Sequence, residues 1–279
     1  MALVREEGWG GGREAGVAAA RCAARAVAPA RADLPPSTSP GKSTLLQVLA
    51  GHHMVPQDAV RVLGRPAFHD TALVSGGDLA YLGAAWRRDA SAGGGALTAD
   101  IGAGDLLAGI PGADPVRRDA LVSMLGVDPA WRLHRLSDGQ RRRVQIAAGL
   151  LRPFKVLLLD EVTVDMDVLA RADLLNYLTN EAEERGAVVV YATHIFDGLA
   201  GWPTHLAHVA GGALARCGPV ETVPELVGAP KLLPVVDAWL RAERAAARAA
   251  GTAACEGGGV APAPVKAPSF PSRQMAFFR

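Results

Sequence analysis

The sequence predicts an α/β fold built around a parallel sheet, on three observations. Two short apolar runs, Val156–Leu159 and Ala187–Ala192, suit strands that are buried on both faces. The segment between them, Val168–Arg185, has helical periodicity, so strand, helix and strand follow one another as in a parallel crossover unit. A Gly-Lys-Ser-Thr turn at residues 41–44 leads directly into a short helical stretch, Leu45–Leu49.

The composition fits a folded protein and excludes several other classes. The chain has 279 residues, of which 49% are hydrophobic, so it is long enough to bury a sizeable core. Its 29 basic and 28 acidic residues leave a net charge of +1, so we expect no direct nucleic-acid binding driven by overall charge. No apolar run approaches the roughly 18–20 residues that a membrane-spanning helix needs. The 3 cysteines are scattered, which indicates reduced thiols and excludes a disulfide scaffold.

The chain divides into a folded body and two ends of different composition. Residues 1–35 are predicted to be disordered or aberrant, because they have a glycine run and alanine–arginine repeats but no alternating β-branched stretch. A transit peptide is the alternative, but the acidic residues here make chloroplast or mitochondrial targeting the weaker interpretation. Residues 36–250 are expected to form the folded domain, which ends in an amphipathic helix at Leu232–Ala250. Residues 251–279 are predicted to be a disordered tail.

The tetrapeptide Gly41-Lys42-Ser43-Thr44 predicts a phosphate site. Backbone N–H groups and the positive end of the dipole favour anions at a helix N-terminus. A lysine in this position can reach β- and γ-phosphates, and the following hydroxyl can hold Mg²⁺. Taken alone, the tetrapeptide is a weak signal, since an ordinary turn that contains a lysine explains it more often than a phosphate site does.

A pair of carboxylates follows the first apolar run. Asp160 ends the predicted strand, where it can hold a metal-bound water, and Glu161 can polarise an attacking water. The alternative is a strand followed by a solvated acidic turn. His194 stands at the end of the second strand, where a histidine is usually structural.

A second polar turn precedes another helix. The sequence Ser137-Asp138-Gly139-Gln140 is followed by three arginines and the helix-like stretch Val144–Leu151, so a second anion-binding helix end is available. The arginine run could instead be a solvated face or a nucleic-acid patch.

Together, these residues resemble the ATP-binding cassette (ABC) ATPases. Lys42, the Ser137–Gln140 signature, the acidic pair and the strand-end histidine occur in that family's order and at its typical spacing. The resemblance covers about residues 41–250. Within it, Leu136–Asp173 looks like the soluble subfamily I proteins of plants, which are similar to the fungal ABC factor associated with the CCR4–NOT complex. The resemblance implies a P-loop NTPase core with a parallel sheet and an ABC-type helical subdomain at about 87–150.

The resemblance also implies roles for individual residues. Ser43 and Asp160 would hold Mg²⁺, Glu161 would activate water, and His194 would sense the γ-phosphate. Asp167 would belong to a loop that faces the second protomer. The signature would complete the ATP site of the opposite protomer, so the chemistry requires a dimer. The implied nucleotide-binding set is Gly41, Lys42, Ser43, Thr44, Ser137, Gly139, Gln140, Asp160 and Asp167.

The implied function is that of a soluble, non-intrinsic ABC protein in the cytoplasm, with the nucleus as a second compartment. It would bind and hydrolyse Mg-ATP in a dimer sandwich and thereby switch a regulatory protein complex of the CCR4–NOT type. The dimer could be a homodimer or pair with a paralogue. Two alternatives remain open: a nucleotide-binding or degenerate scaffold without turnover, and the ATPase subunit of an ABC transporter.

The sequence departs from the family pattern around the phosphate loop, which in the family reads G-x-x-G-x-G-K-[ST]. Pro36 and Ser39 stand where glycines belong, and Pro40 removes an N–H donor. We expect neither the two upstream strands nor the aromatic that stacks on adenine. The segment Asp78–Trp86 also lacks the glutamine that contacts metal and attacking water in the family. These departures predict weakened nucleotide binding and argue against the transporter alternative.

Overall fold

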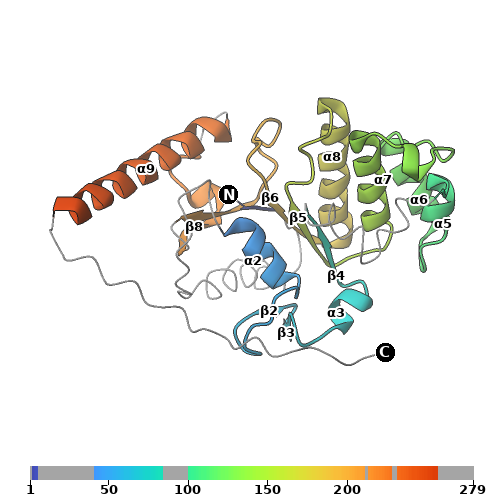
Figure 1. The fold of residues 1–279 in the computed structure, drawn as a ribbon, viewed down its shortest axis with the longest axis horizontal. Coiled ribbons are helices and arrows are strands. Elements are labelled where there is room, and N and C mark those ends of the chain that lie inside the picture. The colour runs from blue at the N-terminus through green and yellow to red at the C-terminus, as the bar shows by residue number, and fades with distance from the viewer. Residues whose placement is uncertain (1, 6–40, 84–99, 211–212, 228–230, 257–279) are drawn as a thin grey trace, which may run out of the picture. The chain divides into compact units, whose positions relative to one another are not determined.

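The central feature of the fold is a six-stranded sheet with the order β4-β5-β6-β1-β7-β8 (Figure 1). The computed structural model describes residues 2–5, 41–83, 100–210, 213–227 and 231–256. The chain divides into two units, Met1–Val236 and Asp237–Arg279, and the sheet belongs to the first. The sheet strands are β1 (Ala2–Arg5), β4 (Leu79–Leu82), β5 (Val156–Asp160), β6 (Val188–Ala192), β7 (His205–Ala210) and β8 (Ala213–Pro219).

Helices flank this sheet and form a separate group beside it. The helices are α2 (Lys42–Leu49), α3 (Ala72–Ser75), α5 (Ala103–Ala108), α6 (Pro115–Met124), α7 (Asp138–Leu150), α8 (Val168–Arg185) and α9 (Leu232–Glu256). Two short 3₁₀ turns add η3 (Leu133–Arg135) and η4 (Val220–Thr222). Helices α5, α6 and α7 lie together at one end of the sheet, in the stretch expected to hold the helical subdomain (Figure 1).

The parallel half of the sheet consists of β5 and β6, which the sequence predicts, and of β4, which it does not. Strand β5 pairs in parallel with β4 and with β6, and the register places Asp160 opposite Ala192. Every residue of β5 and β6 is buried, because helices cover both faces of this part of the sheet. Helix α8 connects β5 to β6 and packs against β6, which completes the predicted crossover unit.

Helix α2 covers one face of the parallel strands. Its residues Leu45, Leu46 and Leu49 join a buried cluster with Val156 and Leu158 of β5. Side chains alternate between the two faces of a strand, so Asp160 points to the same face as Val156 and Leu158. The face that carries α2 is therefore also the face that carries the carboxylate.

Helix α7 approaches β4 very closely. A Cβ atom at Gly149 would lie 2.2 Å from Cδ2 of Leu82, which is inside any normal contact distance. A glycine is needed here for the close approach and not for its backbone angles, since Gly149 lies within the helix.

Strand β1 corrects the expectation of disorder throughout residues 1–35. Ala2–Arg5 lies between β6 and β7 and pairs antiparallel with both. Buried backbone N–H and C=O groups need partners, and β1 supplies them to the facing edges of two strands. The other residues of that segment, and Pro36, Ser39 and Pro40, lie outside the described residues.

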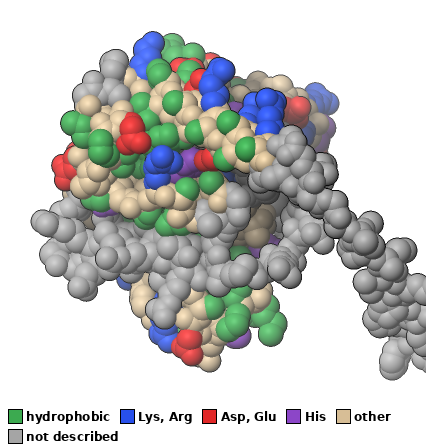
Figure 2. All heavy atoms as spheres, turned by 90° about the vertical axis from the view of Figure 1, so that its left-hand side faces the viewer, with side chains coloured by type: hydrophobic (Ala, Val, Ile, Leu, Met, Phe, Trp, Pro, Cys, Tyr) green, Lys and Arg blue, Asp and Glu red, His purple; other side chains and the backbone are tan. Residues whose placement is uncertain are grey.

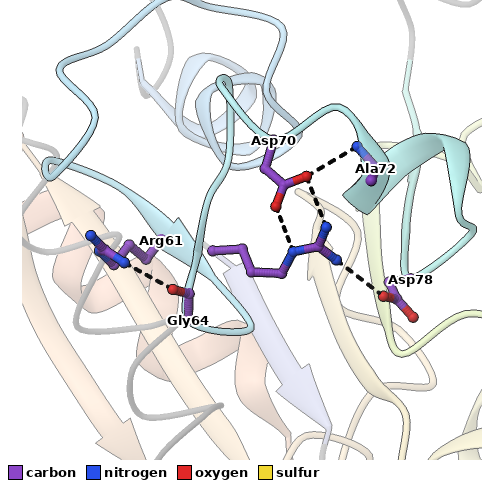
Figure 3. A network of polar contacts seen from close by, with 6 residues as sticks. Arg61, Gly64, Asp70, Ala72 and Asp78 are labelled. Atoms are coloured by element: carbon purple, nitrogen blue, oxygen red, sulfur yellow. Dashed lines mark hydrogen bonds and ion pairs between the residues drawn. The ribbon is translucent and has the colours of Figure 1, made fainter.

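A small hairpin follows α2 and carries an ion-pair network (Figure 3). Strands β2 (Arg61–Val62) and β3 (Arg65–Pro66) are joined by Leu63 and Gly64, both with positive φ, as in a type I′ turn. The Arg65 guanidinium donates to both carboxylate oxygens of Asp70, at 2.6 and 2.8 Å, and to Asp78 at 3.5 Å (Figure 3). The network links the hairpin to Asp78, which directly precedes β4.

The last described helix is longer than the sequence predicts. Helix α9 runs to Glu256, so the first six residues of the expected tail, 251–256, are helical. Residues 257–279 lie outside the described residues. None of the helices that the structure describes combines the length and apolarity needed to cross a bilayer.

Candidate functional site

The predicted carboxylates and the predicted histidine meet at one edge of the sheet. Strands β5 and β6 are parallel and end at the same level, since Asp160 pairs with Ala192 and the Glu161 N–H donates to the Ala192 carbonyl at 2.9 Å. The residues that directly follow both strands are therefore neighbours. The N-terminus of α2 brings Lys42 to the same edge, where its Nζ lies 4.0 Å from Oε1 of Glu161.

Glu161 lies at the centre of this cluster and has a strained backbone. Its φ is 52°, in the left-handed region that a residue with a Cβ rarely adopts. Such a conformation costs about 1–3 kcal/mol and persists only when the surrounding structure fixes it. Here the hydrogen bond to Ala192 fixes the backbone, and the carboxylate Oε1 lies 3.1 Å from Nδ1 of His194. Glu161 is thus held between a lysine and a histidine.

Asp160 is buried, and only one of its two carboxylate oxygens has a hydrogen-bond partner by distance among the described residues. Its Oδ2 accepts a hydrogen bond from the Tyr81 hydroxyl at 3.3 Å, while its Oδ1 is buried and has no hydrogen-bond partner among the described residues. Desolvation by burial raises the pKa of Asp160, and a hydrogen bond from the Ser43 side chain to this carboxylate partly opposes the shift. Buried carboxylate oxygens normally have a partner, so this oxygen is a candidate ligand for a cation.

The N-terminus of α2 is a candidate anion-binding site. Gly41, the N-cap residue, has φ 121° and no side chain to cap the helix, and the first turn contains no acidic residue. The first N–H groups of any helix lack intrahelical acceptors, and among the described residues no side chain takes that place. Lys42 is largely buried beside them, whereas Ser43 and Thr44 are exposed. This end of α2 thus offers N–H donors and an ammonium group to phosphate oxygens.

The signature residues form a local cap and lie apart from this cluster in every contact that the described residues show. Ser137 is the N-cap of α7: its hydroxyl accepts from the Gln140 N–H at 3.3 Å, and the Gln140 side chain accepts from the Ser137 N–H at 3.0 Å. This reciprocal pair is a capping box. Gly139 lies near the Asp165 carbonyl, since a Cβ there would be 3.5 Å from that oxygen.

Asp167 has a local structural role that the sequence did not suggest. It is the N-cap of α8, where its carboxylate accepts from the Ala170 N–H at 2.8 Å and pairs with Arg143. The hydrogen bond to Ala170, more than the charge of Arg143, lowers the pKa of Asp167. The carboxylate therefore fixes the start of α8 and ties it to α7.

The three arginines after the signature, residues 141–143, make contacts within the chain. Arg142 is 3% exposed and its Nε donates to the Val162 carbonyl at 3.1 Å, directly after the acidic pair. Arg141 donates to the Leu136 carbonyl at 3.4 Å, and Arg143 pairs with Asp167. These side chains support the segment that precedes α7 and the loop that follows β5. Basic, acidic and hydrophobic side chains are interspersed on the face shown in Figure 2.

Tyr81 is a site residue that sequence reasoning missed. It lies on β4, opposite Leu158 in register, and its hydroxyl reaches Asp160 on the neighbouring strand. Desolvation, and then the negative charge of Asp160, raises the pKa of Tyr81 to about 12, so its hydroxyl stays protonated at neutral pH and can donate. The sequence does show a tyrosine at this position. Its place beside Asp160 depends on the pairing of β4 with β5.

The donor set fits a hard divalent cation and a phosphate ester. Mg²⁺ prefers oxygen ligands and is usually bound by one or two carboxylates with substrate phosphates completing its shell. The partnerless oxygen of Asp160 and the adjacent Ser43 hydroxyl are such ligands. The N–H groups and ammonium at the start of α2 match phosphate oxygens. The geometry therefore suits a nucleotide whose phosphates lie along the start of α2.

Comparisons with known proteins show which family the chain resembles. The family model described as ABC transporter matches residues 37–164. The chain is 50% identical over 241 residues to ABC transporter I family member 21 of Arabidopsis thaliana, covering 86% of this chain and 82% of that protein. It is 57% identical over 210 residues to member 20 of the same plant family, covering 75% of this chain and 64% of that protein.

A fungal protein and a solved structure extend the comparison. CCR4-associated factor 16 of Saccharomyces cerevisiae is 45% identical over 188 residues, covering 62% of this chain and 63% of that protein. The chain thus spans less than two thirds of the length of member 20 and of the yeast factor. A solved ATP-binding subunit of an ABC transporter has the same fold, with a TM-score of 0.55 at 17% identity, covering 68% of this chain and 78% of that one.

Proposed function

This chain belongs to the ABC transporter family, and we propose that it is an ATP-binding cassette that binds Mg-ATP and hydrolyses it in a dimer. The observation that supports the proposal best is the convergence of Lys42, Asp160, Glu161 and His194 at one edge of the sheet. They come from three separate segments of the sequence: the start of α2, the end of β5 and the end of β6.

Each residue has a role that its chemistry and position support. The start of α2, with Gly41, Lys42 and Thr44, binds the phosphates. Ser43 and Asp160 hold Mg²⁺, which, when bound, neutralises the charge that develops on the phosphates. These contacts fix the γ-phosphate beside Glu161.

The hydrolytic step uses Glu161 as the base. Its carboxylate accepts a proton from a water molecule that attacks the γ-phosphorus, and the bond from that phosphorus to the bridging oxygen breaks to give ADP and phosphate. His194, 3.1 Å from the same carboxylate, orients Glu161 and contacts the γ-phosphate.

The signature acts across the dimer. In one chain Ser137, Gly139 and Gln140 form an exposed or half-buried cap at the start of α7, with no contact to the Lys42 cluster among the described residues. A second cassette that brings this helix end to the phosphates would complete the site with another set of N–H donors. Asp167, next to this turn, would then lie at the surface between the two chains.

The process that the ATP cycle drives is the regulation of a protein complex. The name of the yeast relative states an association with CCR4, and that relative shares 45% identity over 188 residues with this chain. We therefore propose a cytoplasmic or nuclear switch protein whose dimer, homomeric or with a paralogue, opens and closes with ATP turnover. A pull-down of the tagged Glu161→Gln chain with and without Mg-ATP tests whether components of a CCR4-type complex bind in a nucleotide-dependent manner.

A scaffold without turnover is the second candidate, and the phosphate loop favours it. Pro36 and Ser39 replace two glycines of the family pattern, and Pro40 lacks an N–H. If these changes abolish nucleotide binding, the folded body would still offer its surfaces to a partner.

Repair of the phosphate loop separates the proposed ATPase from a scaffold that binds no nucleotide. The variant Pro36→Gly, Ser39→Gly, Pro40→Ala restores two positions that can adopt positive φ and one N–H donor. A hydrogen bond to a charged group contributes about 1.5–3 kcal/mol, so we expect the repaired chain to bind Mg-ATP about ten- to a hundredfold more tightly than the natural chain. Isothermal titration of both chains in one buffer measures this difference.

The titration has three distinct outcomes. Weak binding by the natural chain and tighter binding by the repaired one supports the proposed ATPase. Equal affinities would mean that the loop reaches the phosphates in spite of its prolines. Binding by neither chain would contradict the ATPase and leave the scaffold.

A further inference from the structure

Tyr81 connects the helix that begins the phosphate site to the strand that ends in Asp160. Its hydroxyl donates to Oδ2 of Asp160 at 3.3 Å and is hydrogen-bonded by the side chain of Gln47 from α2. The amide oxygen Oε1 of Gln47 in turn accepts a hydrogen bond from Nε2 of His53 at 3.0 Å. The tyrosine is therefore the middle of a chain of polar contacts that joins α2, β4 and β5.

Gly83 provides the space that the tyrosine ring occupies. A Cβ at Gly83 would lie 2.2 Å from the Tyr81 hydroxyl oxygen and 2.5 Å from Cζ of the same ring. The backbone of Gly83 is not in the left-handed region, so its conformation does not require a glycine. The absence of a side chain at residue 83 matters for the position of the Tyr81 hydroxyl.

The hydrogen bond from Tyr81 leaves the two oxygens of Asp160 unequal. Oδ2 is engaged by the hydroxyl, and Oδ1 is buried and without a partner among the described residues. A carboxylate with one oxygen held in this way cannot turn freely about its terminal bond, so its second oxygen keeps one direction. Ser43, the other oxygen ligand at this position, lies beside the same carboxylate.

We propose that Tyr81 is a positioning residue for the metal-nucleotide: its hydroxyl orients Asp160 so that Oδ1 is presented to Mg²⁺, and Gly83 keeps that hydroxyl in place. The inference rests on the proposed function, because it concerns the Mg²⁺ that accompanies ATP. It assigns a role to a residue at the site that lies outside the acidic pair, the lysine and the histidine.

A purely structural role for Tyr81 predicts something different. The ring packs edge-on to His52 at 5.0 Å between centroids and lies against the buried cluster under α2. Tyr81→Phe keeps these ring contacts and removes only the hydroxyl. A structural role would thus leave the metal dependence of nucleotide binding unchanged, and at most alter stability.

The test measures how much Mg²⁺ tightens nucleotide binding. The dissociation constant of the imido analogue of ATP, which is not hydrolysed, is determined by isothermal titration with excess Mg²⁺ and again with EDTA. The ratio of the two values is compared for the natural chain, Tyr81→Phe and Gly83→Ala. Loss of one hydrogen bond to a charged group predicts that the ratio falls about tenfold in Tyr81→Phe, with the EDTA value unchanged.

Gly83→Ala is the second, independent probe. Its new methyl group displaces the Tyr81 hydroxyl, so we expect the same fall in the ratio. In the double variant, the ratio should fall no further than in either single variant. Tyr177→Phe, which removes the hydroxyl of a tyrosine on α8 away from the site, is the matched control and should keep the natural ratio. Circular dichroism of each variant checks that the chain folds.

The outcomes distinguish this inference from the function on which it rests. If the natural chain binds the analogue in a Mg²⁺-dependent manner and Tyr81→Phe has the same ratio, the positioning role is overturned while the proposed function stands. If the natural chain shows no binding, both are overturned. An additive loss in the double variant would show that Gly83 acts independently of Tyr81, which overturns the linked role.

Discussion

Glu161→Gln is expected to abolish turnover while nucleotide binding survives. The glutamine keeps the size of the side chain but cannot accept a proton from water, and removal of a general base typically lowers the rate by about 10²–10⁴-fold. Binding should persist because the residue is not among the phosphate or metal ligands. The left-handed backbone at φ 52° also tolerates glutamine as it does glutamate, since neither is β-branched.

The same variant reports on the dimer. If hydrolysis normally opens a sandwich of two chains, blocking it should let an ATP-bound dimer accumulate. Phosphate release measures the first effect, and size-exclusion chromatography with Mg-ATP measures the second. Glu225→Gln is the matched control, because this exposed glutamate lies on a different element and pairs only loosely with Arg216, at 3.9 Å. The sandwich mechanism would be contradicted if the Glu161→Gln variant hydrolysed ATP at the natural rate, or if it stayed monomeric at saturating Mg-ATP.

Arg117→Met is expected to have the largest effect on stability. Arg117 of α6 is buried, and its guanidinium donates to both carboxylate oxygens of Glu181 on α8, at 2.6 and 3.1 Å, and to the Leu150 carbonyl at 2.7 Å. Methionine fills much of the space but leaves Glu181 as a buried carboxylate. Breaking a buried pair in this way costs about 3–5 kcal/mol of the free energy of unfolding. We expect the lower end, because Arg185 lies 3.9 Å from Glu181.

Two comparisons isolate the buried pair. Arg117→Met with Glu181→Leu removes both charges, so most of the lost free energy of unfolding should return, since no unpaired carboxylate remains. Arg241→Met breaks the exposed pair with Asp237 and should change the free energy of unfolding by less than about 1 kcal/mol. Urea denaturation followed by circular dichroism measures all four chains. A loss below 1 kcal/mol in Arg117→Met would mean that the pair does not tie α6 to α8.

The strands and helices that build the site were predictable from local sequence. Val156–Leu159 and Ala187–Ala192 are short and apolar, the second is rich in β-branched valine, and buried residues recur at helical spacing along the helix between them. Because parallel strands place their carboxyl ends at one edge, the convergence of Asp160, Glu161 and His194 followed from that topology. Lys42, at the start of α2, lies at the same edge of the sheet, beside Glu161.

Several other features could not be predicted from local patterns. Strand β1 has four residues and pairs with strands almost 200 positions away, so nothing in Ala2–Arg5 alone identifies it. The role of Tyr81 depends on the register between β4 and β5, which sets the hydroxyl beside Asp160. Asp167 appears in the sequence as one acidic residue among several, and its capping role emerges only when the start of α8 is fixed.

Titration of Mg-ATP into the natural chain and into Lys42→Met tests the central claim most directly. The claim is that the edge formed by α2, β5 and β6 is a nucleotide site, and Lys42 is its phosphate-binding cation. Lys155→Met serves as control, because Lys155 is 67% exposed and pairs with Asp78 away from this edge. We expect Lys42→Met to bind about ten- to a hundredfold more weakly and Lys155→Met to bind as the natural chain does. Equal affinities for the natural chain and Lys42→Met would contradict the account.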